Sequence, residues 1–193
     1  MHSKLPNFFV FLDQYNNQIF KNNNTNIGVI YRNYNNSNRE KEAVKIAKAC
    51  KKKRYKLFIS NDIKLTIKVK ADGIYVPAFN KTKRFTNLEK RKLIVLGSAH
   101  NQKEIREKIL QKCFAIFLSP AFYVKKSKKF LGIYKFNSLS LTNKTHIIAL
   151  GGINSQNIHK LRLLYNIKGF GGIGLFKKKP AFKRPVFIKN NFF

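Results

Sequence analysis

The sequence has very few acidic residues. Eight Asp and Glu stand against 40 Lys and Arg in 193 residues, which gives a formal net charge of +32. Such an excess of base is typical of proteins that bind nucleic acids through their phosphates. The 40 basic residues, however, are 32 lysines and only eight arginines. Proteins that recognise guanine or hold a phosphate through two donors of one side chain favour arginine. The charge therefore leaves two interpretations open, an anionic partner or a compositional drift toward lysine.

The lack of acid also excludes one class of nucleotide site. Residues 169–174 satisfy the GxGxxG pattern, but only 19 residues follow Gly174 and no Asp or Glu follows Glu107. A dinucleotide fingerprint needs a helix, a further strand and an acidic residue about 20 positions on. We therefore reject dinucleotide binding through this motif.

Cysteines and long apolar runs are scarce as well. Cys50 and Cys113 lie 63 residues apart without a CxxC spacing, which predicts free thiols and a cytoplasmic protein. No apolar run approaches the roughly 18 residues of a membrane span, so we expect no membrane association. The run 8–12 is too short for the apolar core of a signal peptide. A hydrophobic share of 44% means that the chain as a whole is not a disordered basic segment.

Eight short apolar runs recur along the chain. They are four or five residues long and lack polar alternation, as expected of strands buried on both faces of a parallel sheet. The runs are 8–12, 27–31, 56–59, 73–76, 93–96, 115–118, 147–150 and 169–173.

Helical patterns separate several of these runs. Residues 37–53 begin with Ser37 and Glu40 at capping-box spacing, 101–112 begin with Asn101 as a cap, and 155–164 repeat the apolar spacing. The alternation predicts a small (β/α)8 TIM barrel over residues 1–176, with a basic C-terminal tail over 177–193. Since such barrels usually have about 250 residues, we expect the last helix to be short or missing.

Active sites of such barrels lie at the carboxyl ends of the strands, and the residues there suit a phosphorylated substrate. Glycines that open a helix can cradle a phosphate, basic side chains can hold its oxygens, a carboxylate can bind Mg²⁺, and a histidine can act as acid or base. In chain order the candidates are Arg32, Asn61, Asp62, Ser98, His100, Ser119, Lys128, Gly151 and Gly152.

Each candidate has a structural alternative. Asn61 and Asp62 are also suited to cap a helix, and Gly151 and Gly152 also suit a tight turn. A lone histidine such as His100 is more often structural than catalytic. The basic run 125–129 is also typical of a solvated loop. His2, His146 and His159 have no nearby carboxylate or cysteine grouping, so a zinc site is not expected.

Three stretches resemble the thiamine-phosphate synthase and TenI superfamily in their order and spacing. They are residues 60–62 with 70–75, residues 97–100 with Glu104 and 117–122, and residues 149–153 with Asn157 and Gly169. The forms at 118–122 and 150–153 look closest to a divergent, alphaproteobacterial-like branch. The resemblance implies a barrel enzyme of thiamine biosynthesis, which joins a hydroxymethylpyrimidine diphosphate to a thiazole phosphate and releases diphosphate.

Site roles follow from the resemblance by position. It assigns diphosphate to Arg32, Asn61 and Lys128, with Lys126 as an alternative because the loop is shifted by one residue. It assigns Mg²⁺ to Asp62 and the pyrimidine or diphosphate to Ser98. Gly151, Gly152, Ile173 and Gly174 would surround the thiazole phosphate.

Several positions depart from the family pattern. The second strand lacks the usual Gln and Lys around Arg32, and Tyr75 stands where a His is usual. The second metal carboxylate falls at Asn80, so we expect weaker binding of Mg²⁺. One alternative is a TenI-like thiazole tautomerase, which needs no Mg²⁺ and would use His100 as its proton carrier. Another is a non-catalytic basic barrel that binds RNA in a salt-dependent manner. The sequence does not specify an oligomeric state.

Overall fold

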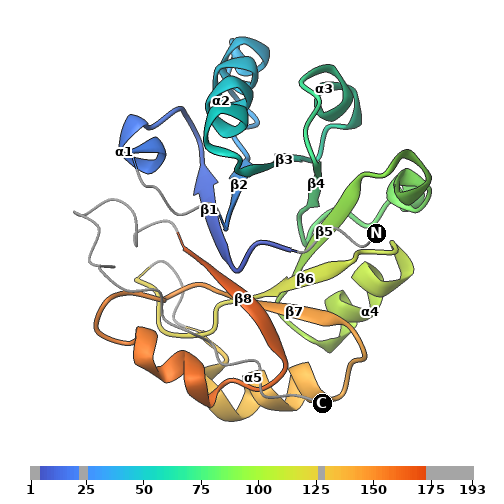
Figure 1. The fold of residues 1–193 in the computed structure, drawn as a ribbon. Coiled ribbons are helices and arrows are strands. Elements are labelled where there is room, and N and C mark those ends of the chain that lie inside the picture. The colour runs from blue at the N-terminus through green and yellow to red at the C-terminus, as the bar shows by residue number, and fades with distance from the viewer. Residues whose placement is uncertain (1–4, 22–25, 126–128, 173–193) are drawn as a thin grey trace.

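A computed structural model describes residues 5–21, 26–125 and 129–172. Eight parallel strands form a closed barrel in which each strand pairs with its neighbours in the sequence and β8 pairs with β1 (Figure 1). This confirms the predicted TIM barrel. The strands are β1 (Phe8–Leu12), β2 (Ile27–Tyr31), β3 (Lys56–Ser60), β4 (Gly73–Val76), β5 (Ile94–Ala99), β6 (Ala115–Leu118), β7 (His146–Leu150) and β8 (Ile167–Gly172).

The strands are apolar on both faces because both faces are buried. The interior of the barrel is filled by one cluster that includes Phe9 and Phe11 of β1, Phe58 of β3 and Phe117 of β6. The rings of Phe9 and Phe117 meet edge-on with their centroids 5.0 Å apart. The alternate residues of the same strands, such as Val10, face outward into separate clusters beneath the helices. The two-sided burial thus accounts for the missing polar alternation.

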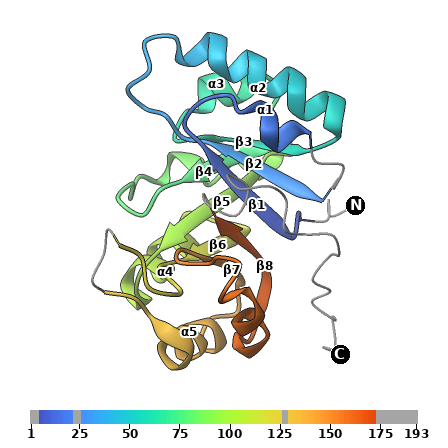
Figure 2. The ribbon, with the colours of Figure 1, turned by 90° about the vertical axis from the view of Figure 1, so that its left-hand side faces the viewer.

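Helices surround the barrel unevenly. Figure 2 shows α2 and α3 over one side and α5 over the opposite side. The α-helices are α1 (Asn17–Phe20), α2 (Arg39–Lys53), α3 (Ile63–Lys68), α4 (Gln102–Leu110) and α5 (Gly132–Leu141). Short 3-10 helices, η1 (Lys83–Phe85), η2 (Leu88–Arg91) and η3 (Ile158–Leu163), serve the crossovers after β4 and β7.

Some local predictions were wrong in detail. Helix α2 begins at Arg39 after Asn38, which makes no side-chain cap, so the capping box of Ser37 and Glu40 does not form. The segment predicted as a helix over 155–164 is the 3-10 helix η3. The cap at Asn101 is confirmed, because its side chain accepts a hydrogen bond from the Glu104 backbone N–H at 3.0 Å.

Three further predictions concern the cysteines, membrane spans and the segment after β8. Cys50 and Cys113 are free and buried, as expected. No helix among the described residues is long and apolar enough to cross a membrane. The segment after β8, for which a short or missing last helix is predicted, lies outside the described residues, as does the tail 177–193.

Candidate functional site at the carboxyl ends of the strands

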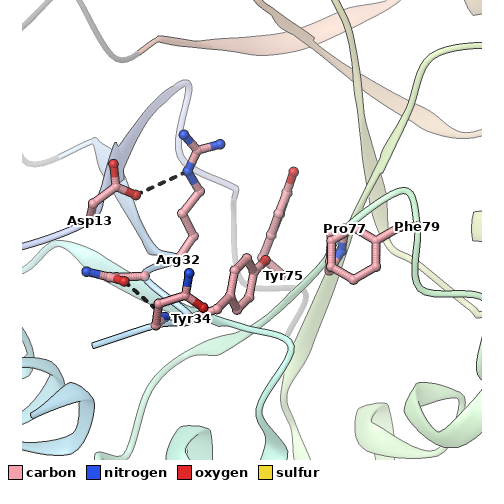
Figure 3. Close-up of a pocket in the computed structure, with 8 residues that line it drawn as sticks. Asp13, Arg32, Tyr34, Tyr75, Pro77 and Phe79 are labelled. Carbon is pink, nitrogen blue, oxygen red and sulfur yellow. Dashed lines mark hydrogen bonds and ion pairs between the residues drawn. The ribbon is translucent and has the colours of Figure 1, made fainter. Parts of the chain in front are cut away.

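A cavity of about 350 Å³ opens among the segments that follow β1, β2 and β4 (Figure 3). Its lining combines charged, amide and aromatic groups: Asp13, Arg32, Asn33, Tyr34, Asn35, Tyr75, Pro77 and Phe79. The Nε atom of Arg32 lies 3.4 Å from the Asp13 carboxylate, and its guanidinium lies 5.5 Å from the ring centroid of Phe11. Arg32, the predicted phosphate ligand, therefore lines the cavity, and its guanidinium contacts the ring of Phe11 from the barrel interior.

Ser98 reaches this region through a hydrogen bond with Tyr75. It is a buried residue of β5 and not a loop residue, because β5 ends at Ala99, three residues beyond the predicted run 93–96. Tyr75 of the neighbouring strand β4 lines the cavity. Burial raises the pKa of Tyr75 to about 12, although its hydrogen bond to Ser98 opposes the shift. Tyr75 is thus a neutral hydroxyl near neutral pH, and it occupies the position where the family pattern has a histidine.

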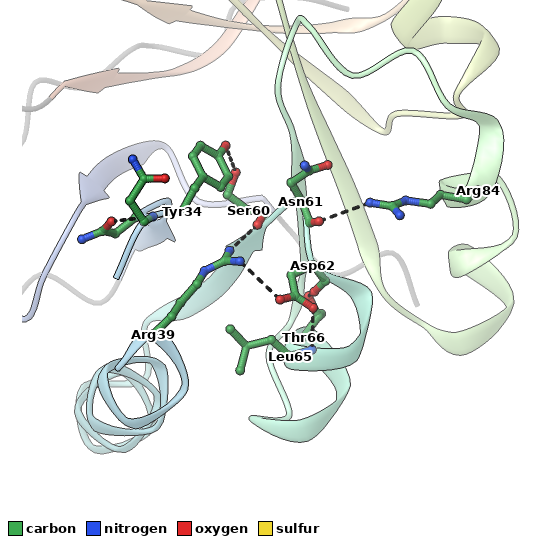
Figure 4. A network of polar contacts seen from close by, with 10 residues as sticks. Tyr34, Arg39, Ser60, Asn61, Asp62, Leu65, Thr66 and Arg84 are labelled. Carbon is green, nitrogen blue, oxygen red and sulfur yellow. Dashed lines mark hydrogen bonds and ion pairs between the residues drawn. The ribbon is translucent and has the colours of Figure 1, made fainter. Parts of the chain in front are cut away.

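A polar network surrounds the loop that follows β3 (Figure 4). The hydroxyl groups of Tyr34 and Ser60 lie 2.6 Å apart. Arg39, at the start of α2, donates from Nη2 to the Ser60 carbonyl oxygen at 2.6 Å. Its guanidinium also lies 5.6 Å from the ring centroid of Tyr34. Sequence reasoning missed both Tyr34 and Arg39, since neither directly follows a predicted strand.

Asp62 caps helix α3, which confirms the structural alternative for this residue. Its Oδ1 accepts a hydrogen bond from the Leu65 backbone N–H at 2.9 Å. Its Oδ2 lies 3.3 Å from the Nη1 atom of Arg39. Both carboxylate oxygens therefore have partners, and a role for Asp62 as a metal ligand stays a prediction.

Asn61 and Asn80 meet across the ends of β3 and β4. Asn61 adopts a left-handed backbone conformation at φ 59° and accepts a hydrogen bond from the Asn80 side-chain amide. The Oδ1 atom of Asn80 accepts from the backbone N–H and the hydroxyl of Thr82, each at 2.9 Å. Arg84 donates to the Asn61 carbonyl oxygen at 3.4 Å. The amide of Asn80 thus orients Asn61 and fixes its own loop.

A buried lysine supports the loop after β4 from behind. Lys108 of α4 is fully buried, and its ammonium donates to the carbonyl oxygens of Pro77 and Asn80 at 2.8 and 2.7 Å and to the Gln111 side chain at 2.8 Å. Burial lowers the pKa of Lys108, and the nearby Cys113 opposes that shift. All three N–H groups of the ammonium have acceptors. No sequence signal distinguished this lysine from the many others.

His100 follows β5 and is held by a carboxylate. Its Nδ1 lies 2.8 Å from the Oε2 of Glu104, which also accepts from the His100 backbone N–H at 2.8 Å. Burial raises the pKa of Glu104, but the hydrogen bonds from His100 and Asn101 outweigh burial and lower it overall. The imidazole is half exposed. Because a carboxylate fixes Nδ1, the Nε2 atom is the one left for proton transfer.

The loop after β7 packs closely against the loop after β6. Gly151 and Gly152 have φ values of 87° and 73°. The backbone N–H of Phe122 donates to the Gly151 carbonyl oxygen at 3.1 Å, and Ser119 precedes a cis proline in the same β6 loop. The glycines do not open a helix directly, because η3 begins only at Ile158. The prediction that they provide a helix N-terminus was therefore wrong, and backbone geometry at the turn remains their contribution.

Other predicted site residues cannot be placed. Lys126, Lys128, Ile173 and Gly174 lie outside the described residues. Among the residues that are described, Arg32, Asn61, Ser98, His100, Ser119 and the two glycines all lie at or next to carboxyl ends of strands.

The comparison with protein families decides what this barrel is related to. The family model for thiamine monophosphate synthase matches residues 20–173. The chain belongs to this family. The match covers β2 to β8 and thus includes all candidate residues from Arg32 to Gly152.

Individual relatives of the thiamine monophosphate synthase family agree. The thiamine-phosphate synthase of Prochlorococcus marinus subsp. pastoris is 30% identical over 131 residues, which cover 66% of this chain and 37% of that protein. The thiamine-phosphate synthase of Helicobacter pylori is 26% identical over 142 residues, which cover 71% of this chain and 65% of that protein. The chain thus spans little more than a third of its Prochlorococcus relative.

A solved structure supports the fold. The thiamine phosphate pyrophosphorylase from Pyrococcus furiosus superposes with a TM-score of 0.74 over 92% of this chain and 90% of that chain. The two sequences are 14% identical, so this likeness shows a shared barrel and not a shared substrate.

The Mg²⁺ site that the family resemblance implies is the feature that the residues present fit least well. Magnesium binds through oxygen ligands, usually one or two carboxylates with waters and substrate phosphates. Asp62 is paired with Arg39, and the second position is the neutral Asn80. Within the described ranges, no group of three or more His, Cys, Asp and Glu is placed to hold a metal ion.

Proposed function

We propose that the chain is a cytoplasmic thiamine-phosphate synthase-like transferase, which joins hydroxymethylpyrimidine diphosphate to thiazole phosphate and releases diphosphate. The family match over residues 20–173 carries this proposal. The described candidate residues lie at or next to the carboxyl ends of the strands of one closed barrel, which supports a single site at that end.

The residues present suggest a division of the site. Arg32 and Asn61, together with Lys126 or Lys128, would bind the diphosphate, while Ser98 and the neighbouring Tyr75 would face the pyrimidine. Ser119, Gly151, Gly152, Ile173 and Gly174 would surround the thiazole phosphate.

The reaction that this arrangement would support needs mainly charge stabilisation. The bond between the pyrimidine methylene carbon and diphosphate breaks, diphosphate leaves with the electron pair, and the thiazole nitrogen lone pair forms the new carbon–nitrogen bond. Donors such as the Arg32 guanidinium would stabilise the charge that develops on the departing group.

The direct test is product formation by the purified chain. With both substrates present, we expect thiamine phosphate, detected as its fluorescent oxidation product after chromatography. Because a charged hydrogen bond contributes roughly 1.5–3 kcal/mol, Arg32→Met should lower kcat/KM about tenfold to a hundredfold. Arg54→Met, which removes the same charge just after the far end of α2, should leave kcat/KM within twofold of the unchanged protein. Absence of product from a folded protein would refute the synthase.

A thiazole tautomerase is the second candidate, and the pairing of His100 with Glu104 favours it. General acid–base catalysis by one side chain typically contributes about 10²–10⁴-fold. We therefore expect His100→Asn to lower proton exchange on a thiazole carboxylate phosphate by about that factor, measured by deuterium incorporation in NMR. His159→Asn serves as the matched control, since His159 lies on η3 away from β5. Unchanged exchange in His100→Asn would eliminate this candidate.

A further inference from the structure

Two carboxylates that follow strands at the barrel mouth are already paired with arginines. Asp13, after β1, contacts Arg32, and Asp62, after β3, contacts Arg39. The second pair is well shielded, because the side chains of Arg39 and Asp62 are only 19% and 31% exposed. The other oxygen of Asp62 caps α3, so a metal ion there would have to displace a guanidinium or compete with the helix cap.

Asn80 offers no compensating negative charge. Its side-chain oxygen accepts two hydrogen bonds from Thr82, and its side-chain nitrogen donates to Asn61. The amide is therefore committed to the loop, with its donor side toward Asn61. A divalent cation would meet neutral, hydrogen-bonded oxygens where it needs anionic ones.

Arginines gather around the same loop. Arg39 binds the Ser60 carbonyl oxygen and the Asp62 carboxylate, and Arg84 binds the Asn61 carbonyl oxygen. Arg32 lines the adjacent cavity, and its contact with Asp13 involves Nε. Three of the chain's eight arginines thus surround the ends of β2 and β3, although lysine is four times as frequent in the sequence. Arginine remains charged at every relevant pH and binds oxyanions through a fork of donors.

We propose that this site binds the diphosphate group directly through guanidinium and amide donors, without a bridging Mg²⁺. Arg39 is a positioning residue. Its guanidinium pairs with the Asp62 carboxylate in place of a metal ion and holds the β3 loop. Arg32 supplies the positive charge that faces the ligand. The choice of diphosphate as ligand rests on the proposed function, whereas independence from metal rests on the pairing of Asp62 and the neutrality of Asn80.

The experiment is calorimetric titration with inorganic diphosphate at constant ionic strength, in EDTA and in excess Mg²⁺. We expect the unchanged protein to bind in EDTA, with an affinity that is equal or weaker in Mg²⁺, because Mg²⁺ sequesters the free anion. The double variant Arg39→Gln/Asn80→Asp frees one carboxylate and adds another. This variant should bind diphosphate at least tenfold more tightly in Mg²⁺ than in EDTA, a difference of about 1.4 kcal/mol in binding free energy. Arg54→Gln removes the same charge as Arg39→Gln and should behave like the unchanged protein.

Several outcomes would overturn the inference. One is an affinity of the unchanged protein that rises tenfold or more with Mg²⁺, and another is no diphosphate binding in either condition. A double variant that is folded by thermal unfolding yet gains no Mg²⁺ dependence would also contradict it. The proposed function is tested separately, since metal-free diphosphate binding without thiamine phosphate formation refutes the synthase alone. Conversely, product formation together with Mg²⁺-enhanced diphosphate binding refutes only the metal-free site.

Discussion

Replacing Phe117 by alanine should lower the free energy of unfolding by about 3–5 kcal/mol, the usual cost of removing a large aromatic side chain from a packed core. Phe117 is fully buried at the centre of the barrel. Its ring meets those of Phe9, Phe11 and Tyr75 at centroid separations of 5.0, 5.5 and 5.7 Å. A closed barrel restricts how far its walls can collapse, so most of the space left by the missing ring should remain empty.

Urea unfolding followed by circular dichroism measures this effect. Tyr134→Ala is the matched control, because Tyr134 on α5 is 93% exposed and should change the stability by no more than about 0.5 kcal/mol. A loss below about 1 kcal/mol for Phe117→Ala would mean that the interior repacks around the missing ring. Since Phe117 contacts Tyr75, which lines the cavity, the same variant should also weaken ligand binding.

The barrel was predictable because its signal is repeated eight times. Each short apolar run is ambiguous alone, but their regular succession with helical patterns between them is typical of one fold. The inward face of each strand was not predictable. Phe8, Phe9, Val10 and Phe11 are all apolar, so nothing in the sequence indicates that Phe9 and Phe11 enter the interior while Val10 packs beneath the helices.

The site was predictable only where one residue acts through its local position. Asn101 and Asp62 both cap the helices that follow them, a role set by their place between strand and helix. The pairing of Asp62 with Arg39 spans 23 positions and depends on how the first residue of α2 lies against the end of β3. Lys108 is equally hidden, since its burial depends on the β4 loop whose carbonyl oxygens accept its hydrogen bonds.

The β7 loop leads to the second large expected effect, at Gly152. A Cβ atom there would lie 2.3 Å from the carbonyl oxygen of Phe122, and the residue has a φ of 73°. The left-handed conformation costs a non-glycine residue about 1–2 kcal/mol, and overpacking against backbone adds roughly 1–3 kcal/mol. Gly152→Ala should therefore destabilise the protein by about 2–5 kcal/mol.

The same clash should displace the surface that is proposed to bind the thiazole phosphate. The carbonyl oxygen of Gly152 accepts a hydrogen bond from Asn157 at 2.7 Å, so the loop cannot shift without breaking this contact. If it shifts, the loss of two or more donors to the phosphate should weaken binding of thiazole phosphate about a hundredfold, measured by calorimetric titration below the unfolding transition.

Gly132→Ala separates the steric effect from the conformational one. Gly132 has nearly the same φ, 68°, but a Cβ atom there would have its nearest neighbour 3.8 Å away, at the ring edge of Phe130. This variant should lose only the conformational part, about 1–2 kcal/mol, and should retain its affinity for thiazole phosphate. Equal losses of stability and affinity in the two variants would show that the close approach of Gly152 to the β6 loop has no role in binding. A loss of affinity confined to Gly152→Ala would instead support a phosphate site built from the backbone of the β7 turn, with no contribution from a helix N-terminus.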